Sequence, residues 1–492
     1  MPPATSPGSH EARYVTRRRT PDRAARIRFR RAITLMLMTL VVPGSAQLVA
    51  GRREVGRLAI RIWMGLVVAV ALVALLAWSS TSFALWAGTN TSVLNLVRFV
   101  IMLVAIGWAA LFIDAWRLGE PLTLVRNQRL AMVGINGVLC FSVAGTLLFA
   151  AHLITVQRDF IDTVFTATEV SEATHGRYNV LLIGGDSADG RFGLRPDSLN
   201  VASIDQETGE TVLIGLPRNL QNFTFGEGSV MAEQFPDGWT CDDCYLNSVA
   251  TWAGDNTELF DDAEHAGTQA TIEAVEGITG LKINYWVMVN LKGFEQLVDA
   301  VGGVTINVMD PIPIGGFSTP VKGYIEPGLQ ELDGYHALWF ARSRHGSDDY
   351  SRMARQKCVM NAIATQVSPQ TVLMNFKEIT EAGSSMMETS IPASELDNFI
   401  DLALKARKHE IGTVSIVPPQ INTAHPDLEL IREMVAQGIN PDSAPEKAPE
   451  PAGGADRPEQ ASPASPVTNG GSVGSKKDGY AANQSEDLAS VC

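Results

Sequence analysis

Long apolar stretches are confined to the first third of this 492-residue chain. Four of them precede residue 157, and they cover residues 33–50, 62–79, 94–116 and 131–156. The last three are long enough to cross a bilayer as helices. We therefore predict an α-helical transmembrane region over residues 33–156, followed by a separate polar domain.

The first apolar stretch differs from the other three. It is short, and Pro43, Gly44 and Ser45 interrupt it. Arginines are dense on both sides, between residues 13 and 31 and again between residues 52 and 61, which marks both ends as cytoplasmic. We predict a basic cytoplasmic N-terminus over residues 1–32 and a re-entrant hairpin over residues 33–50.

The loops between the spans predict their orientation. Residues 80–95 carry no charge and are expected outside, whereas residues 117–129 carry three arginines and are expected inside. Three spans then place everything after residue 156 outside the cytoplasm, and four full spans would place it inside. The expected location is the cell membrane, with several spans and no cleaved signal peptide.

Charge also divides the chain. Residues 1–130 carry 17 Lys and Arg against 5 Asp and Glu, whereas residues 178–492 carry a formal net charge of −24. A domain this acidic repels nucleic acid, so no nucleic-acid partner is expected. Any anion that the domain binds must be held by a local basic cluster.

The polar domain interleaves strands and helices, which predicts an α/β fold. The expected helices cover residues 263–278, 291–300 and 352–367, and the expected strands cover residues 178–184, 199–204, 211–216, 284–290, 304–308 and 337–341. Residues 157–177 read as a polar stem and residues 178–435 as the domain itself. Residues 436–492, rich in Pro, Ala, Gly and Ser, are expected to be a disordered tail.

A group of arginines is the clearest candidate for anion binding. Four of them lie within 14 residues, namely Arg342, Arg344, Arg352 and Arg355. Arginine forks match phosphate oxygens in a bidentate manner. The first two are expected at the end of a strand, and Arg352 and Gln356 on one face of a helix. The alternative is a solvated turn in which Asp348 and Asp349 pair with the arginines.

Two aspartates and a further arginine follow predicted strands. Asp186 closes the strand 178–184, Asp197 opens the next one, and Arg218 follows the strand 211–216. Carboxylates from neighbouring strand ends can share a magnesium ion with phosphate oxygens. The alternative for Asp186 and Asp197 is a loop in which Asp and Gly only make turns.

Three cysteines fall in the acidic domain. Cys241, Cys244 and Cys358 permit a disulfide, either within the Cys-x-x-Cys pair or from one member of the pair to Cys358. A redox pair and free thiols are the alternatives. A single Cys-x-x-Cys provides too few ligands for structural zinc.

Together these segments resemble the LytR-CpsA-Psr family of cell-wall glycopolymer ligases, in its actinobacterial form with several N-terminal membrane segments. The resemblance covers residues 178–368 and fades toward residue 435. It is carried by residues 180–186, Arg195-Pro-Asp197-Ser198, Pro217-Arg218, residues 293–304, residues 328–334, Arg342-Ser-Arg344 and Asp349-x-x-Arg352-x-x-x-Gln356. Asn219 and Tyr245 depart from the family pattern, which often has Asp and Lys there.

The resemblance implies roles for particular residues. Asp186 and Asp197 would hold Mg²⁺ or Mn²⁺, and Asp349 would be a supporting residue or a general base. Catalysis would depend on Arg342, Arg344 and Asp349. The donor's pyrophosphate would be gripped by Arg218, Arg342, Arg344, Arg352 and Gln356. The implied fold is a mixed central sheet sandwiched by helices, with an apolar tunnel for the lipid.

The implied activity is a magnesium-dependent phosphotransfer. A glycan phosphate would pass from a polyprenyl-pyrophosphate carrier to peptidoglycan or a surface glycoprotein, and polyprenyl phosphate would be released. Two alternatives stay open: hydrolysis of the polyprenyl pyrophosphate, and a non-enzymatic membrane-bound regulator or lipid-binding scaffold. The polymer could be arabinogalactan, a teichoic-acid-like polymer or a glycan destined for a surface protein.

Overall fold

The computed structural model describes residues 23–165, 169–185, 195–316, 319–345, 347–367 and 387–440. The chain divides into two compact units, one of residues 1–81 and 95–155 and the other of residues 82–94 and 156–492. The predicted tail lies outside the described residues from residue 441 on, and its start at 436 is corrected because a helix continues through Ile439.

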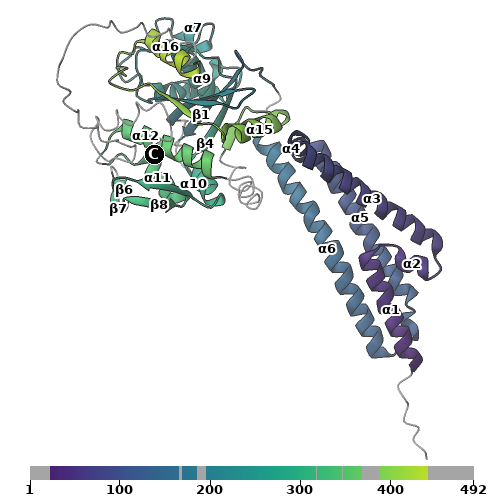
Figure 1. The fold of residues 1–492 in the computed structure, drawn as a ribbon. Coiled ribbons are helices and arrows are strands. Elements are labelled where there is room, and N and C mark those ends of the chain that lie inside the picture. Colours follow the sequence, from purple (N-terminus) through teal and green to yellow (C-terminus); the bar gives the residue numbers. More distant parts are fainter. Residues whose placement is uncertain are drawn as a thin grey trace, which may run out of the picture. The chain divides into compact units, whose positions relative to one another are not determined.

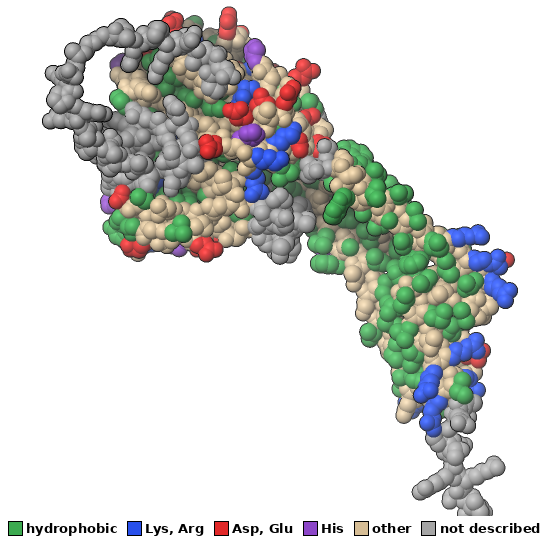
Figure 2. All heavy atoms as spheres, in the orientation of Figure 1, with side chains coloured by type: hydrophobic (Ala, Val, Ile, Leu, Met, Phe, Trp, Pro, Cys, Tyr) green, Lys and Arg blue, Asp and Glu red, His purple; other side chains and the backbone are tan. Residues whose placement is uncertain are grey.

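The first unit consists of helices (Figure 1). Three helical segments, Arg53–Ser79, Thr91–Thr123 and Arg126–Val164, are long and apolar enough to cross a membrane, and each contains one of the three predicted spans. Large apolar side chains such as Val70, Leu75 and Phe141 are exposed on them, and Figure 2 shows this apolar surface in green. The helices are α1 (Arg23–Val41), α2 (Ser45–Val49), α3 (Arg53–Ser79), α5 (Thr91–Leu118) and α6 (Arg126–Val164).

A break separates α1 from α2 at the predicted Pro-Gly-Ser interruption. Gly44 there has a φ of 93°, and a Cβ added to it would lie 2.6 Å from the Cβ of Ala59 on α3. Only glycine therefore fits this close approach. The Gln47 side chain donates to the Leu111 carbonyl at 3.0 Å, which ties the short helix to α5.

Two segments differ from the predicted pattern. A short helix, α4 (Thr81–Thr89), and a 3₁₀ turn, η1 (Pro121–Thr123), occupy parts of the two loops between the predicted spans. Helix α6 continues to Val164, so the first part of the predicted polar stem is helical.

The second unit is built on a six-stranded mixed sheet with the order β10-β3-β2-β1-β4-β9. Strand β1 pairs in parallel with β4, β10 pairs in parallel with β3, and the other neighbours are antiparallel. The strands are β1 (Arg177–Gly185), β2 (Pro196–Asp205), β3 (Thr211–Leu216), β4 (Tyr285–Asn290), β9 (Met387–Thr389) and β10 (Gly412–Ser415). The first four confirm the strands predicted along this part of the chain.

Helices cover both faces of this sheet, as Figure 1 shows for β1 and β4. Alternate residues of β1 point to opposite sides, because side chains alternate along a strand. Leu181 and Ile183 join the large core under α9 and α16, whereas Val180 and Leu182 pack with Phe399 of α15. The helices are α7 (Val230–Gln234), α8 (Val249–Asp255), α9 (Ala266–Thr279), α12 (Asp349–Gln366), α15 (Leu396–Ala406) and α16 (Leu428–Ile439).

A second core lies beside the sheet. It contains two antiparallel strand pairs, β5 with β8 and β6 with β7, together with α10, α11 and one face of α12. Phe340, Ala354 and Cys358 are buried in it. The elements are β5 (Val304–Val308), β6 (Ile312–Gly316), β7 (Thr319–Ile325), β8 (Gly328–Leu332), α10 (Leu291–Ala300) and α11 (Gly334–Arg342). The described part of the unit also contains the short 3₁₀ turns η2 (Leu246–Ser248), η3 (Thr257–Leu259) and η4 (Ala393–Glu395).

One predicted strand is wrong. Residues 337–341 form the middle of helix α11, not a strand leading into Arg342. The Asp333 carboxylate caps this helix by accepting from the His336 amide at 2.9 Å. A short apolar run has no clear period, so the sequence does not distinguish a helix from a strand here. The N-terminal cap and the burial of Ala337 and Phe340 stabilise the helix.

Candidate active site

Three elements bring charged residues to one edge of the sheet. Strand β2 pairs antiparallel with β3, and Leu199 lies opposite Leu216. This register places the start of β2, with Asp197, beside the end of β3, where Arg218 follows. The N-terminus of α12 reaches the same edge, because Asp349 and Arg352 both form ion pairs there.

We call Asp197, Arg218, Arg344, Asp349 and Arg352 the Arg–Asp cluster. Its contacts converge on two carboxylates. Arg218 Nη1 donates to Asp197 Oδ1, and Arg218 Nε lies 3.3 Å from the Asp349 carboxylate. Arg352 Nη2 donates to Asp349 Oδ2 at 3.0 Å, and Arg344 Nη1 lies 3.5 Å from Asp349 Oδ1. One aspartate thus faces three guanidinium groups.

Burial sets the electrostatics of the cluster. Arg352 is only 3% exposed, and burial lowers its pKa to about 10, against the opposing pull of Asp349 and Asp197. Burial also acts against the charge of Arg218, but Asp349 and Asp197 outweigh it and raise the pKa of this guanidinium. The formal charges of the five members of the cluster, three arginines and two aspartates, sum to +1.

Gln356 lies one turn along α12 from Arg352 and contacts β2. The Ser198 hydroxyl donates to Gln356 Oε1 at 3.1 Å, and Asn200 Nδ2 donates to the Ser198 hydroxyl at 3.2 Å. This chain of polar contacts joins the predicted Gln356 to the sheet edge. Ser198 appeared in the sequence only as part of a motif, and its spacing to Gln356, 158 residues, explains why pattern alone did not pair them.

The other two arginines of the sequence group have different surroundings. The Arg342 guanidinium lies over the Trp339 ring, 5.3 Å from its centroid, and forms no ion pair with any described residue. Arg355 is fully buried, and its side chain donates to the Phe340 carbonyl at 2.7 Å and to the Ser343 carbonyl. Arg355 therefore holds the end of α11 and the segment that presents Arg344.

The carboxylates of the cluster suit a hard cation only in part. Asp186 lies outside the described residues, and Asp197 already accepts from Arg218. Within the described ranges, no group of three or more His, Cys, Asp or Glu side chains could hold a metal ion. Asp349 Oδ1 is buried and accepts no hydrogen bond from the residues described, but Arg218 Nε and Arg344 Nη1 lie 3.3 Å and 3.5 Å from it as ion-pair partners.

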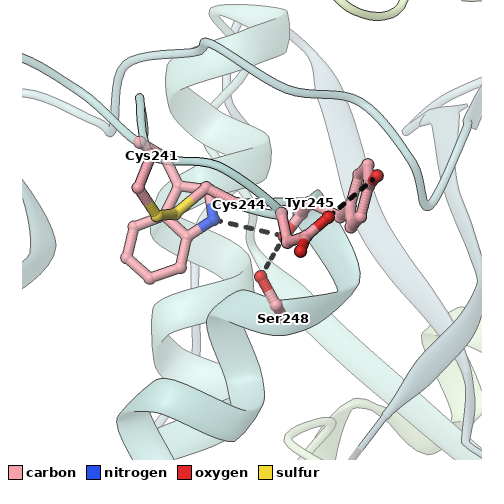
Figure 3. The surroundings of a disulfide bond; sticks show 6 residues. Cys241, Cys244, Tyr245 and Ser248 are labelled. Atoms are coloured by element: carbon pink, nitrogen blue, oxygen red, sulfur yellow. Dashed lines mark hydrogen bonds between the residues drawn. A yellow bond between two sulfur atoms is a disulfide. The ribbon is translucent and has the colours of Figure 1, made fainter.

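A disulfide joins Cys241 and Cys244, whose Cα atoms are 5.1 Å apart (Figure 3). Of the pairings that the sequence left open, the structure therefore has the one within the Cys-x-x-Cys pair. Cys358 is buried in the second core, on α12. The disulfide borders an open cavity of about 550 Å³.

The comparisons with known proteins agree on one family. The model of the LytR_cpsA_psr family matches residues 155–427. The polyisoprenyl-teichoic acid–peptidoglycan teichoic acid transferase TagU of Oceanobacillus iheyensis is 27% identical over 241 residues, which are 48% of this chain and 66% of that protein. The probable cell wall biosynthesis protein LcpB of Corynebacterium glutamicum is 27% identical over 258 residues, covering 48% and 54% of the two chains.

The chain thus spans about two thirds or less of the length of these two relatives. Among solved structures, TagV of Bacillus subtilis is 21% identical, with a TM-score of 0.39, over 54% of this chain and 96% of that one.

Proposed function

The chain belongs to the LytR_cpsA_psr family, and on that premise we propose that it transfers a glycan phosphate from a polyprenyl-pyrophosphate carrier to a cell-wall acceptor. The observation that carries the proposal is the convergence of Arg218, Arg344 and Arg352 at one sheet edge of a strongly acidic domain. The relative TagU is named a teichoic acid transferase, which supports the same reaction class.

The arginines bind and orient the donor. Arginine forks match the oxygens of a pyrophosphate, and Arg352 is held by Asp349 so that it needs no reorganisation when the donor arrives. Arg344, whose side chain is 33% exposed, is the member best placed to contact the donor. Gln356, held by Ser198, adds an amide to the same edge.

The transfer itself is a substitution at phosphorus. An acceptor hydroxyl attacks the sugar-side phosphorus, a new O–P bond forms, the bond to the bridging oxygen breaks, and polyprenyl phosphate leaves. Negative charge grows on the bridging and equatorial oxygens, where fixed guanidinium groups stabilise it. Asp349 Oδ1, which is buried and accepts no hydrogen bond from the described residues, is the candidate base for the hydroxyl proton.

The proposed transfer would use a magnesium ion. Asp197, together with Asp186, would hold the ion, which would neutralise phosphate charge when bound. Chelation should stop transfer, and Asp186→Ala should raise the magnesium concentration that transfer requires. Unchanged magnesium dependence in Asp186→Ala would exclude that role.

We also propose that the second unit lies outside the cytoplasm. The activated pyrophosphate linkage needs no ATP, so the second unit would work at the outer face of the membrane, where both donor and acceptor lie. The three apolar helices would anchor it there.

Mass spectrometry of bound lipid tests the proposal. The full chain is purified in detergent, and the lipid that it retains is extracted from wild type, Arg344→Ala and Arg342→Ala. Polyprenyl phosphate or pyrophosphate is expected on wild type but not on Arg344→Ala. Because Arg342 lies over Trp339 and away from the Arg–Asp cluster, Arg342→Ala should retain the lipid, and this would remove Arg342 from the expected pyrophosphate-binding residues. A wild type with no affinity for added polyprenyl pyrophosphate would favour a scaffold over an enzyme.

A further inference from the structure

We propose that the cavity beside the Cys241–Cys244 disulfide binds the saccharide acceptor of the transfer. That the saccharide is the acceptor rests on the proposed function. That the cavity binds a saccharide rests on the cavity itself. The cavity has a volume of about 550 Å³, within the range of about 300–1,000 Å³ typical of small-molecule sites.

The lining of the cavity has the chemistry of a sugar site. Tyr245 and Trp252, both partly exposed, contribute aromatic surface against which the C–H faces of a pyranose ring can pack, and the buried Trp239 lies behind them. Asp243, Asn247 and Asp255 contribute carboxylate and amide groups, which hydrogen-bond well to hydroxyls. Aromatic and hydrogen-bonding groups therefore face the same space.

The aromatic wall is rigid. Trp239 is 4% exposed, and its ring packs edge-on against Phe235 with the ring centroids 4.7 Å apart. Phe235 packs in the same way against Trp252, with the centroids 4.9 Å apart. Trp239 Nε1 donates to the Tyr245 carbonyl at 3.2 Å. A wall held in this way loses little side-chain freedom when a ligand binds.

The rim is fixed by the disulfide. Asp243, inside the Cys-x-x-Cys loop, has a φ of 62°, an uncommon conformation for a non-glycine residue. The Tyr245 hydroxyl lies 3.4 Å from Asp243 Oδ1, and the Ser248 hydroxyl donates to the Tyr245 carbonyl at 2.7 Å (Figure 3). Strained backbone that neighbouring bonds hold in place is often found at ligand sites.

The cavity adjoins the Arg–Asp cluster through two backbone connections. The amide of Asn247 donates to the carbonyl of Arg218 at 3.0 Å, and the amide of Leu246 donates to the carbonyl of Leu220 at 2.9 Å. Arg195, on the cavity lining, is two residues from Asp197. A saccharide in the cavity would therefore lie next to the proposed phosphate site.

Charge separates the two sites. The Arg–Asp cluster is net positive, whereas the cavity lining has Asp243 and Asp255 against Arg195. An anionic pyrophosphate is attracted to the cluster and disfavoured in the cavity, while uncharged sugar hydroxyls can donate to both carboxylates. The cavity is thus better suited to the hydroxyl-bearing, uncharged part of an acceptor saccharide than to the donor's pyrophosphate.

Direct binding tests the site without turnover. The full chain in detergent micelles is titrated with a soluble, fluorescently labelled peptidoglycan oligosaccharide, and binding is followed by anisotropy. Tyr245→Ala and Asp255→Asn should weaken binding about tenfold or more, equivalent to about 1.4 kcal/mol. Asp242→Asn, on the same loop but not on the cavity lining, is the matched control and should bind as wild type does.

Kinetics separate this inference from the proposed function. With a polyprenyl-pyrophosphate donor, Tyr245→Ala should raise the acceptor KM about tenfold and leave the donor KM unchanged. Oligosaccharide binding that is lost in Tyr245→Ala, in a protein that does not turn over the donor, would support the saccharide site and reject the transferase. Wild type without oligosaccharide binding, or equal binding by all variants, would overturn the site. A raised donor KM alone would assign the cavity to the donor.

Discussion

Arg218 Nε lies 3.3 Å from the carboxylate of Asp349, although 131 residues separate them in the sequence. Arg218 follows a strand and Asp349 begins a helix, so the contact exists only because β3 ends and α12 begins at the same edge of the sheet. Asp349 also pairs with Arg344 and Arg352. It therefore assembles the three guanidinium groups that the proposed phosphate site needs.

Arg344→Ala should reduce glycan transfer about 10²–10³-fold, as the loss of one fixed donor to a charged transition state does. Arg342→Ala is the matched control, because Arg342 lies over Trp339 and forms no ion pair with the described residues. We expect it to change the rate less than about tenfold, in line with the weak energy of a cation–π contact. Transfer rates in proteoliposomes measure both, and equal losses would show that both arginines contact the donor.

Asp349→Asn should destabilise the second unit. It leaves Arg352 buried with only Asp197, at 3.9 Å, as a counter-charge. Breaking a buried ion pair costs about 3–5 kcal/mol, and we expect about 3 kcal/mol because Asp197 remains. Thermal unfolding of the full chain, followed by near-UV circular dichroism, should show a Tm lower by about 6–12 °C.

The neighbouring aspartate provides the control for that change. Asp348 caps α12 by accepting from the Ser351 amide at 2.8 Å, and asparagine caps helices equally well. Asp348→Asn keeps the cap and removes only the attraction between Asp348 and the buried Arg355, so it should lower the Tm less than Asp349→Asn does. If Asp349→Asn and Asp348→Asn had the same Tm, the ion pairs of Asp349 would contribute nothing to stability.

Lys357 should make stability depend on pH. Burial lowers its pKa to about 7 from an ordinary value of 10.5, and its amine donates to the Ser415 hydroxyl. Between these two pH values the unfolded chain holds a proton that the folded chain does not, so Lys357 destabilises the fold. The penalty shrinks by about 1.4 kcal/mol per unit as pH rises through this window, and it is constant below pH 7.

Substitution of Lys357 measures this penalty. Lys357→Met should raise the Tm most near pH 7 and progressively less toward pH 10. Lys405→Met, at a half-exposed lysine paired with Asp401 at 3.0 Å, should show no such trend. A Lys357→Met variant that is destabilised equally at every pH would mean that the Ser415 hydrogen bond outweighs the burial of the amine.

The disulfide reports the orientation of the second unit. If that unit lies outside the cytoplasm, intact cells treated with a membrane-impermeant phosphine and then an impermeant maleimide should be labelled at the exposed Cys241. The Cys241→Ser, Cys244→Ser double variant is the control for the remaining cysteines. Labelling that appears only after cell lysis would place the unit in the cytoplasm.

Much of the fold follows from the sequence alone. Short apolar runs that end at turn residues predict buried strands, and apolar residues at helical spacing predict helices, so β1, β2, β3, β4, α10 and α12 were predictable close to their observed bounds. The arginine motifs likewise identified the family before any contact was known. Residues 337–341 were predicted as a strand and form a helix, because five apolar residues fit either period.

The tertiary structure alone decided which charges meet. Sequence spacing grouped Arg342 with Arg344, but the helical end of α11 places one over Trp339 and the other beside Asp349. Asp197, expected only as a metal ligand, also pairs with Arg218. Electrostatic energy depends on distance in space and on burial, and strand register and helix packing set both, so a one-dimensional pattern names candidates without their partners.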